Sequence, residues 1–137
     1  LMADHPTLDQ LFAHRARAHA ERPLVVGGHS GVLGGGNGTG PAGRALTYGQ
    51  VDAQGAALAA ALADLGVAPG DRLAVSLPNV PEWMVVLRAA AALGAVLVPV
   101  SPRLNAHEFK YQLRHAGAAA LVTAERDDGV DSLALYE

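Results

Sequence analysis

Short apolar segments alternate with helical patterns over residues 45–123, and this alternation restricts the fold more than any other feature of the chain. Three segments are almost continuously apolar, as strands covered on both faces are: Leu73–Leu77, Ala95–Val100 and Ala119–Thr123. Segments of helical length and periodicity separate them, which favours crossover connections and a parallel sheet. The sequence therefore predicts an α/β fold in which the order from Leu73 onward is β-α-β-α-β.

Polar residues that can cap exposed backbone amides mark four helix starts. Each start is a Thr or Asn followed three residues later by Gln or Glu, namely Thr7/Gln10, Thr47/Gln50, Asn79/Glu82 and Asn105/Glu108. Glycine marks three helix ends, at Gly66, Gly94 and Gly117. The helix that follows Thr47 should bury an apolar stripe made of Val51, Leu58, Leu62 and Leu65.

Glycine content divides the chain into unequal parts. Nine of the eighteen residues from 27 to 44 are glycine, so this segment has few side chains to bury and loses much backbone entropy on ordering. We expect a flexible surface loop there, between an N-terminal helix and strand (residues 1–26) and an α/β layer (residues 45–123). Residues 124–137 form an unassigned tail of what we interpret as a single partial domain.

Composition excludes several classes of function. The 137 residues carry a net charge of −3 and no cluster of basic residues, which gives no reason to expect a nucleic-acid partner. The chain has no cysteine, which excludes disulfides and suits a reducing compartment. Its longest apolar stretch, Met84–Val100, is too short and too interrupted to span a bilayer. We expect a soluble, cytoplasmic protein with no membrane span.

The glycine-rich segment contains a formal dinucleotide-binding pattern, Gly38-x-Gly40-x-x-Gly43. That motif works only where a helix begins directly after it, so that backbone amides face the pyrophosphate. Here Pro41 removes one amide, and an extended segment follows. We interpret the segment as a surface loop and not as a phosphate site.

The six histidines raise the question of a metal site. His107 and His115 lie on one helix face, but two helical turns separate them by roughly 12 Å, too far to share one ion. His14 and His19 point in different directions around their helix. Trp83 lies on an apolar helix face and is interpreted as a core residue. From the residues alone, the sequence predicts no catalytic and no metal-binding residue.

Five short motifs, in their order and spacing, resemble the adenylate-forming enzymes, the AMP-binding superfamily that includes acyl-CoA and aryl-CoA synthetases. The motifs are Leu46-Thr47-Tyr48, Leu65–Arg72 (LGVAPGDR), Asn79-x-Pro81-Glu82, Ala92–Val100 (ALGAVLVPV), and Pro102-Arg103-Leu104 with Glu108 and Leu113. Ser101-Pro102-Arg103-Leu104 is most similar to the Asn-Pro-Arg-Leu of the CoA synthetases, with Ser101 in place of Asn. The resemblance extends from Leu8 to Thr123 and implies a partial N-terminal subdomain of the adenylate-forming fold.

The resemblance also implies an activity for the complete enzyme. Such an enzyme activates a carboxylic acid with ATP and Mg²⁺ to an acyl-adenylate and then transfers the acyl group to CoA. In the family the residues that bind ATP and Mg²⁺ lie beyond the position of Glu137, so we expect this fragment to be inactive alone and to bind no cofactor tightly. One contact is carried over: Arg126 follows the strand whose loop approaches the CoA nucleotide in acetyl-CoA synthetase-like members.

Two functions remain open at this point. The chain is either the N-terminal part of an acid–CoA ligase, with the remainder of the adenylating enzyme as its partner, or a non-enzymatic interaction or scaffold module of the same fold. The identity of the carboxylic acid is open, as is the thiol acceptor, CoA or a carrier protein. Because the predicted strands need cover on both faces and the chain supplies about four helices, we also expect self-association.

Overall fold

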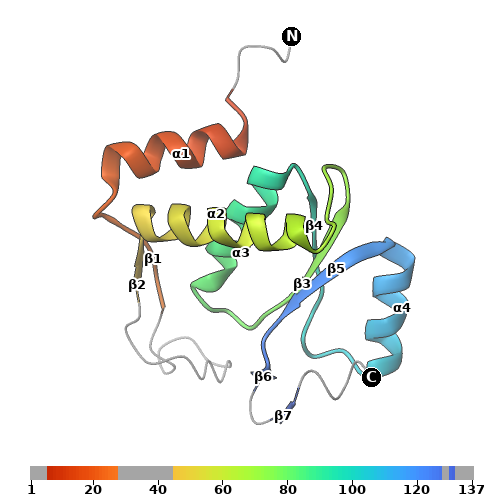
Figure 1. The fold of residues 1–137 in the computed structure, drawn as a ribbon. Helices are drawn as coiled ribbons and strands as arrows, with labels where there is room; N and C mark the ends of the chain where they lie inside the picture. The colour runs from red at the N-terminus through yellow and green to blue at the C-terminus, as the bar shows by residue number, and fades with distance from the viewer. Residues whose placement is uncertain (1–5, 28–44, 128–129, 132–137) are drawn as a thin grey trace.

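The computed structural model describes residues 6–27, 45–127 and 130–131, whose arrangement is shown in Figure 1. The elements are α1 (Leu8–His19), β1 (Pro23–Val26), β2 (Ala45–Thr47), α2 (Tyr48–Asp64), β3 (Arg72–Ser76), α3 (Glu82–Leu93), β4 (Val96–Pro99), α4 (Ala106–Ala116), β5 (Ala118–Thr123), β6 (Arg126–Asp127) and β7 (Val130–Asp131). The glycine-rich segment and its dinucleotide-like pattern lie, apart from Gly27, outside the described residues.

A three-stranded parallel sheet with the order β4-β3-β5 forms the centre of the molecule. The helices α2 and α3 lie on one face of this sheet and α4 lies on the other (Figure 1). The chain crosses from β3 to β4 through α3 and from β4 to β5 through α4. The predicted β-α-β-α-β order and its parallel sheet are therefore confirmed.

The central strand β3 divides its side chains between two cores. Leu73 and Val75 are fully buried against Val86 of α3, on the side covered by α2 and α3. Ala74 points to the opposite face, where it packs with Phe109 of α4. This strand is covered on both faces, as its continuously apolar sequence predicts.

The outer strands β4 and β5 are less buried than their sequences predict. Val96 at the start of β4 keeps 51% of its surface exposed, and most of β5 is half-buried. The sequence analysis expects strands that need cover on both faces in a chain with too few helices to supply it, and within the described residues each of these two strands also pairs on one side only. Apolar composition does not distinguish a central strand from an edge strand, since that depends on what lies next to it.

The predicted helix caps are formed at three of the four helices. Complete capping boxes join Thr7 to Gln10, Thr47 to Gln50 and Asn105 to Glu108. Gly94 and Gly117 end α3 and α4 in the left-handed conformation, and Gly66 follows α2 with a φ of 92°. These ends confirm the predicted glycine stops.

The predicted cap at Asn79 was wrong. Helix α3 begins at Glu82, with Pro81 at the N-cap position and no side-chain capping bond. Pro81 already has helical dihedral angles, and the Trp83 amide donates to the Val80 carbonyl at 3.1 Å. The chain thus enters the helix through a tight turn at Pro81, which leaves Asn79 in a bend before the cap.

The predicted apolar stripe of α2 holds for Val51 and Leu62, which are buried, and for Leu58, which packs beside them. It was wrong for Leu65, which is 81% exposed. Leu65 is the C-cap residue of α2, where the chain turns back, and Val67 enters the core in its place. The helical period predicts a face only as far as the helix continues.

The N-terminal elements pack on the outer side of α2 and α3. The strands β1 and β2 pair antiparallel, with Val26 opposite Ala45, and α1 lies against α2 and α3 (Figure 1). Phe12 of α1 and Val51 of α2 belong to a second apolar core with Val85 of α3. Across the described part of the chain, none of the helices has the length and apolar character needed to cross a membrane.

Candidate functional site

The carboxyl edge of the parallel sheet is the first candidate site, because ligands of open α/β sheets bind outside the carboxyl ends of the strands. Ser76 ends β3 and Thr123 ends β5, and Ser101 follows β4. In the parallel sheet the carboxyl ends of these strands lie at one edge, and β5 leads from that edge into the short strand β6 (Figure 1). The fold therefore brings three hydroxyl side chains to one edge.

Two of the three hydroxyl groups at this edge, those of Thr123 and Ser101, form hydrogen bonds with the backbone. Ser76 and Thr123 are register partners, and the Thr123 hydroxyl donates to the Ser76 carbonyl at 3.1 Å. The Ser76 side chain is 1% exposed, and its Oγ has no hydrogen-bond partner among the described residues. A hydroxyl this deeply buried is not accessible to a dissolved substrate, so this pair joins two strand ends and does not present a nucleophile.

The segment after β4 is a turn that leads into α4. The Ser101 hydroxyl accepts from the Arg103 amide at 3.3 Å, which closes the turn in the motif that resembles the CoA synthetases. Arg103 itself is exposed. The predicted CoA contact, Arg126, lies in β6, opposite Asp131 of β7 and directly after the carboxyl end of β5. Its role toward CoA stays a prediction.

Residues of the Leu65–Arg72 motif stabilise the opposite, amino edge of the sheet. The Asp71 carboxylate accepts from the Ala68 amide at 2.8 Å, and Gly70 has a φ of 87° that favours glycine. The Arg72 Nε donates to the Gly117 carbonyl at 3.0 Å, which places a cation at the C-terminus of α4. These interactions fix loops and helix ends.

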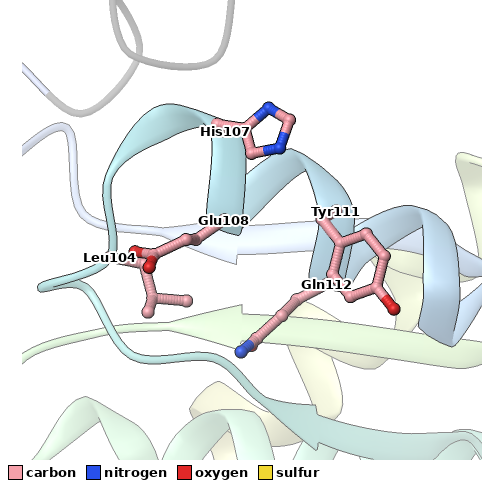
Figure 2. A pocket seen from close by; sticks show the side chains of 5 residues that line it. All are labelled: Leu104, His107, Glu108, Tyr111 and Gln112. Atoms are coloured by element: carbon pink, nitrogen blue, oxygen red, sulfur yellow. The ribbon is translucent and has the colours of Figure 1, made fainter.

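A shallow pocket of about 280 Å³ lies on the exposed side of α4. It is lined by Leu104, His107, Glu108, Tyr111 and Gln112. His107 and Glu108 extend from the helix in different directions (Figure 2). The Glu108 carboxylate already accepts from the Asn105 amide in the capping box. The pocket therefore does not bring an acid and a base together.

One of the two histidines of α4 makes a ring contact. His115 stacks on Tyr111, with ring centroids 5.7 Å apart and planes inclined by 13°. Within residues 6–27, 45–127 and 130–131, no group of three His, Cys, Asp or Glu side chains is placed to hold a metal ion. Trp83 packs against the core as predicted, and its indole nitrogen donates to the Leu77 carbonyl at 3.2 Å.

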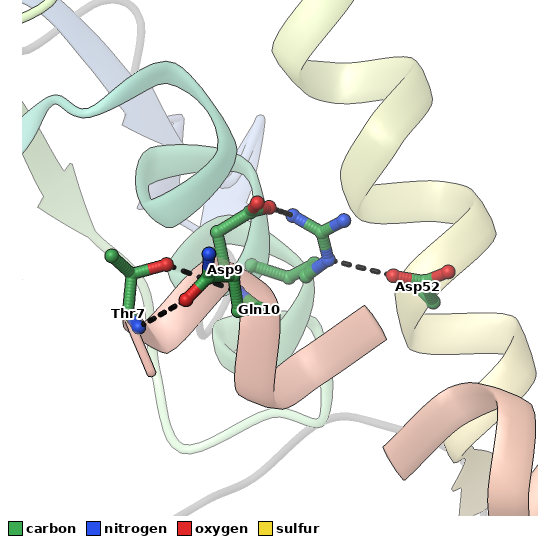
Figure 3. Close-up of polar contacts among 5 residues, drawn as sticks. Thr7, Asp9, Gln10 and Asp52 are labelled. Carbon is green, nitrogen blue, oxygen red and sulfur yellow. Dashed lines mark hydrogen bonds and ion pairs between the residues drawn. The ribbon is translucent and has the colours of Figure 1, made fainter. Parts of the chain in front are cut away.

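A buried ion-paired arginine was missed by the sequence analysis. Arg88 of α3 is 7% exposed, and its guanidinium contacts Asp52 of α2 at 2.7 Å and Asp9 of α1 at 2.6 Å. The two carboxylates approach the guanidinium from opposite sides (Figure 3). The available signal was a charged residue within an apolar helix face, which requires a partner when buried. Because both carboxylates neutralise it, this arginine joins three helices.

The structure thus defines an α/β layer in which the recognisable motif residues stabilise turns, caps and strand ends. The sequence pattern of the AMP-binding enzyme family matches residues 12–136, which is most of the chain. The chain belongs to the AMP-binding enzymes, and the resemblance derived from its five motifs is confirmed. Its fold is part of the N-terminal domain of adenylate-forming enzymes.

Named relatives include CoA ligases and triostin synthetase I. The chain is 41% identical over 93 residues to a feruloyl-CoA synthase from Amycolatopsis, covering 67% of this chain and 19% of that protein. It is 31% identical over 125 residues to triostin synthetase I from Streptomyces triostinicus, covering 90% of this chain and 21% of that protein. The chain therefore spans about a fifth of the length of these relatives.

Among solved structures, the fold matches the inhibitor-bound N-terminal domain of FACL13 from Mycobacterium tuberculosis. The two share a TM-score of 0.71 and 28% identity. The match covers 87% of this chain and 27% of the other.

Proposed function

We propose that this chain is the N-terminal part of an ATP-dependent carboxylic acid–CoA ligase that works in the cytoplasm. In this reaction the carboxylate of the acid attacks the α-phosphorus of ATP, which releases pyrophosphate and forms an acyl-adenylate. The thiol of CoA then attacks the acyl carbon and releases AMP. The proposal is carried by the match to the AMP-binding enzymes over residues 12–136 and by the 41% identity to a feruloyl-CoA synthase.

In that reaction this chain builds part of the N-terminal domain and positions the other parts of the enzyme, and it is inactive alone. Its motif residues are engaged within the fold, as the hydrogen bonds of Asp71, Arg72 and Ser101 illustrate. ATP, Mg²⁺ and the acid bind mainly to the remainder of the adenylating enzyme, which is the principal partner of this layer. Electrostatic stabilisation of the transferring phosphoryl group requires cationic groups and preorganised amides that converge on one point.

Arg126 is the one residue that we assign to a cofactor. It follows the carboxyl end of β5, the sheet edge at which ligands of α/β folds bind. A guanidinium is suited to bidentate contacts with phosphate, and the nucleotide part of CoA carries three phosphate groups. The contact would bind CoA for the second half-reaction only.

The first test combines two observations. Calorimetry measures ATP binding to the 137-residue chain, and sequencing shows how the reading frame that encodes it continues. The expected result is no ATP binding tighter than about 10 µM, because no phosphate-binding element is proposed here. The frame should continue into a Ser/Thr/Gly-rich loop with a lysine. ATP binding tighter than about 10 µM would contradict the inactive role, and a frame without that loop would favour the scaffold function.

Arg126 is tested in the protein encoded by the complete reading frame. Arg126→Gln should raise the KM for CoA about tenfold, the loss expected for a charge-assisted hydrogen bond. ATP–pyrophosphate exchange, which reports adenylation alone, should be unchanged. Arg114→Gln on α4 is the matched control and should alter neither. An unchanged KM for CoA with intact exchange would refute the Arg126 assignment and leave the ligase function standing.

A further inference from the structure

An apolar groove of about 270 Å³ runs beside α1. Its lining side chains come from four elements: Leu8, Leu11, Phe12 and Arg15 of α1, Leu24 of β1, Tyr48 of α2 and Met84 of α3. Leu8 and Leu11 remain 45% and 43% exposed, although Phe12 beside them is buried. The groove therefore offers apolar surface that the described part of the fold leaves uncovered.

Two polar groups of this groove have no partner among the described residues. Arg15 makes no hydrogen bond or ion pair there, in contrast to Arg88, which contacts two carboxylates. Tyr48 is held by an edge contact with the ring of His19, at 6.2 Å between centroids, while its hydroxyl makes no hydrogen bond to the described residues. The groove thus combines apolar walls with one uncompensated cation and one hydroxyl donor.

The one acidic residue within α1 is already ion-paired. Asp9 lies on the same helix, but its carboxylate contacts the buried guanidinium of Arg88. A ligand that brings its own negative charge would therefore add an ion pair without breaking one. An aliphatic tail on the same ligand would cover Leu8 and Leu11 and remove their apolar surface from water.

We propose that this groove binds a small amphipathic carboxylate, with its aliphatic chain along the leucines and its carboxylate at Arg15 and Tyr48. The volume lies just below the roughly 300–1,000 Å³ of sites for drug-sized molecules, which fits an unbranched chain of medium length. A docked helix is disfavoured because it would need a longer groove with several anchor positions. The inference rests on the residues of the groove and not on the ligase function.

The test is a methyl chemical-shift titration of the 137-residue chain with hexanoate, octanoate and decanoate. The methyl groups of Leu8, Leu11, Leu24 and Met84 should shift together. The dissociation constant for decanoate should be on the order of 1 mM or tighter. Affinity should rise about fourfold for each added methylene until the tail fills the groove.

Two comparisons test the role of the carboxylate. Arg15→Gln should weaken decanoate binding about tenfold, as expected for the loss of a hydrogen bond to a charged group. It should leave binding of uncharged decanol unchanged. Arg17→Gln, two positions further along the exposed part of α1, is the matched control and should leave decanoate binding unchanged. Both positions are exposed, so neither change threatens the fold.

Three results would overturn the proposal. The first is an absence of shifts at the groove methyl groups with 10 mM decanoate. The second is equal affinity for decanoate and decanol, because the groove would then recognise apolar surface alone. The third is a nuclear Overhauser contact between the groove and another part of this chain or a second copy, which would mean that protein already occupies the groove.

Discussion

The aliphatic stem of Arg88 runs directly over Gly55 of α2. A Cβ placed at Gly55 would lie 2.3 Å from Arg88 Cγ and 2.7 Å from Arg88 Cβ. These atoms belong to the fixed, buried end of the side chain and cannot move aside cheaply. The absence of a side chain at Gly55 therefore allows the guanidinium to reach Asp9 and Asp52.

Gly55→Ala should destabilise the protein by about 1–3 kcal/mol, the usual cost of overpacking a core. This is the opposite of the gain that the higher helix propensity of alanine would give, about 1 kcal/mol. Urea denaturation followed by circular dichroism measures the change. The exposed neighbour Gln54→Ala is the control and should lie within about 0.5 kcal/mol of the parent. A Gly55→Ala protein as stable as the parent would mean that α2 and α3 lie further apart in solution than in this structure.

Ser76 and Thr123 should respond to substitution in opposite directions. Ser76→Ala removes a buried hydroxyl that lacks a partner in the described structure, and should stabilise the protein by about 1 kcal/mol. Thr123→Val removes the hydrogen bond to the Ser76 carbonyl and should destabilise it by about 1 kcal/mol. Thermal denaturation of both variants measures the two shifts. A destabilised Ser76→Ala would show that its hydroxyl has a bonding partner in solution.

At the scale of elements, the helix starts separate local signals from tertiary ones. Thr47 accepts from the Gln50 amide at 3.2 Å, and the Gln50 side chain accepts from the Thr47 amide at 2.9 Å, so both bonds lie within one turn. Such a box is visible in sequence because its members are three residues apart. The same spacing at Asn79 and Glu82 predicted a cap that does not form, because Pro81 sets the start of the helix.

Substitutions at the two helix starts should therefore differ in their effect on the free energy of unfolding. Thr47→Ala should cost about 1 kcal/mol, the typical loss of an N-cap. Asn79→Ala should change the free energy of unfolding by less than about 0.5 kcal/mol, because its side chain does not cap α3. Chemical denaturation of the two variants side by side provides the comparison. An equal loss at Asn79 would restore the capping interpretation that the structure rejects.

At the scale of the whole molecule, apolar surface remains uncovered. The strands β4 and β5 are the outer strands of the sheet, and Val96 at the start of β4 is half exposed. Leu65 and Val26 are exposed at other positions. Unpaired strand edges and apolar surface both promote association with another chain.

We expect the 137-residue chain to form dimers or larger species at about 100 µM, as its sheet edges imply. Val96→Lys should shift this equilibrium toward the monomer, because a charge on an edge strand opposes pairing. Ala57→Lys, on the exposed side of α2, adds the same charge away from the sheet and serves as the control. Light scattering gives the mass directly, and a parent protein that measures 14.0 kDa would contradict the prediction.

The sequence by itself determined the four helices, three of their four caps, the glycine stops and the parallel β-α-β-α-β order, but not the short strands β6 and β7 of the tail. Each of these depends on residues a few positions apart, or on connections whose handedness and length allow few alternatives. It also identified the family, through motifs that the fold uses for turns. For the candidate site it supplied Arg126 by resemblance alone.

Only the tertiary structure decided which strand is central, where Leu65 leaves the core, and how the buried charge is neutralised. Arg88 contacts Asp52 and Asp9 across separations of 36 and 79 residues. The environments of Ser76 and of the α1 groove likewise depend on elements that are distant in sequence. Local patterns record the preferences of a residue for helix, strand or turn, whereas burial and charge pairing arise only once distant elements are packed together.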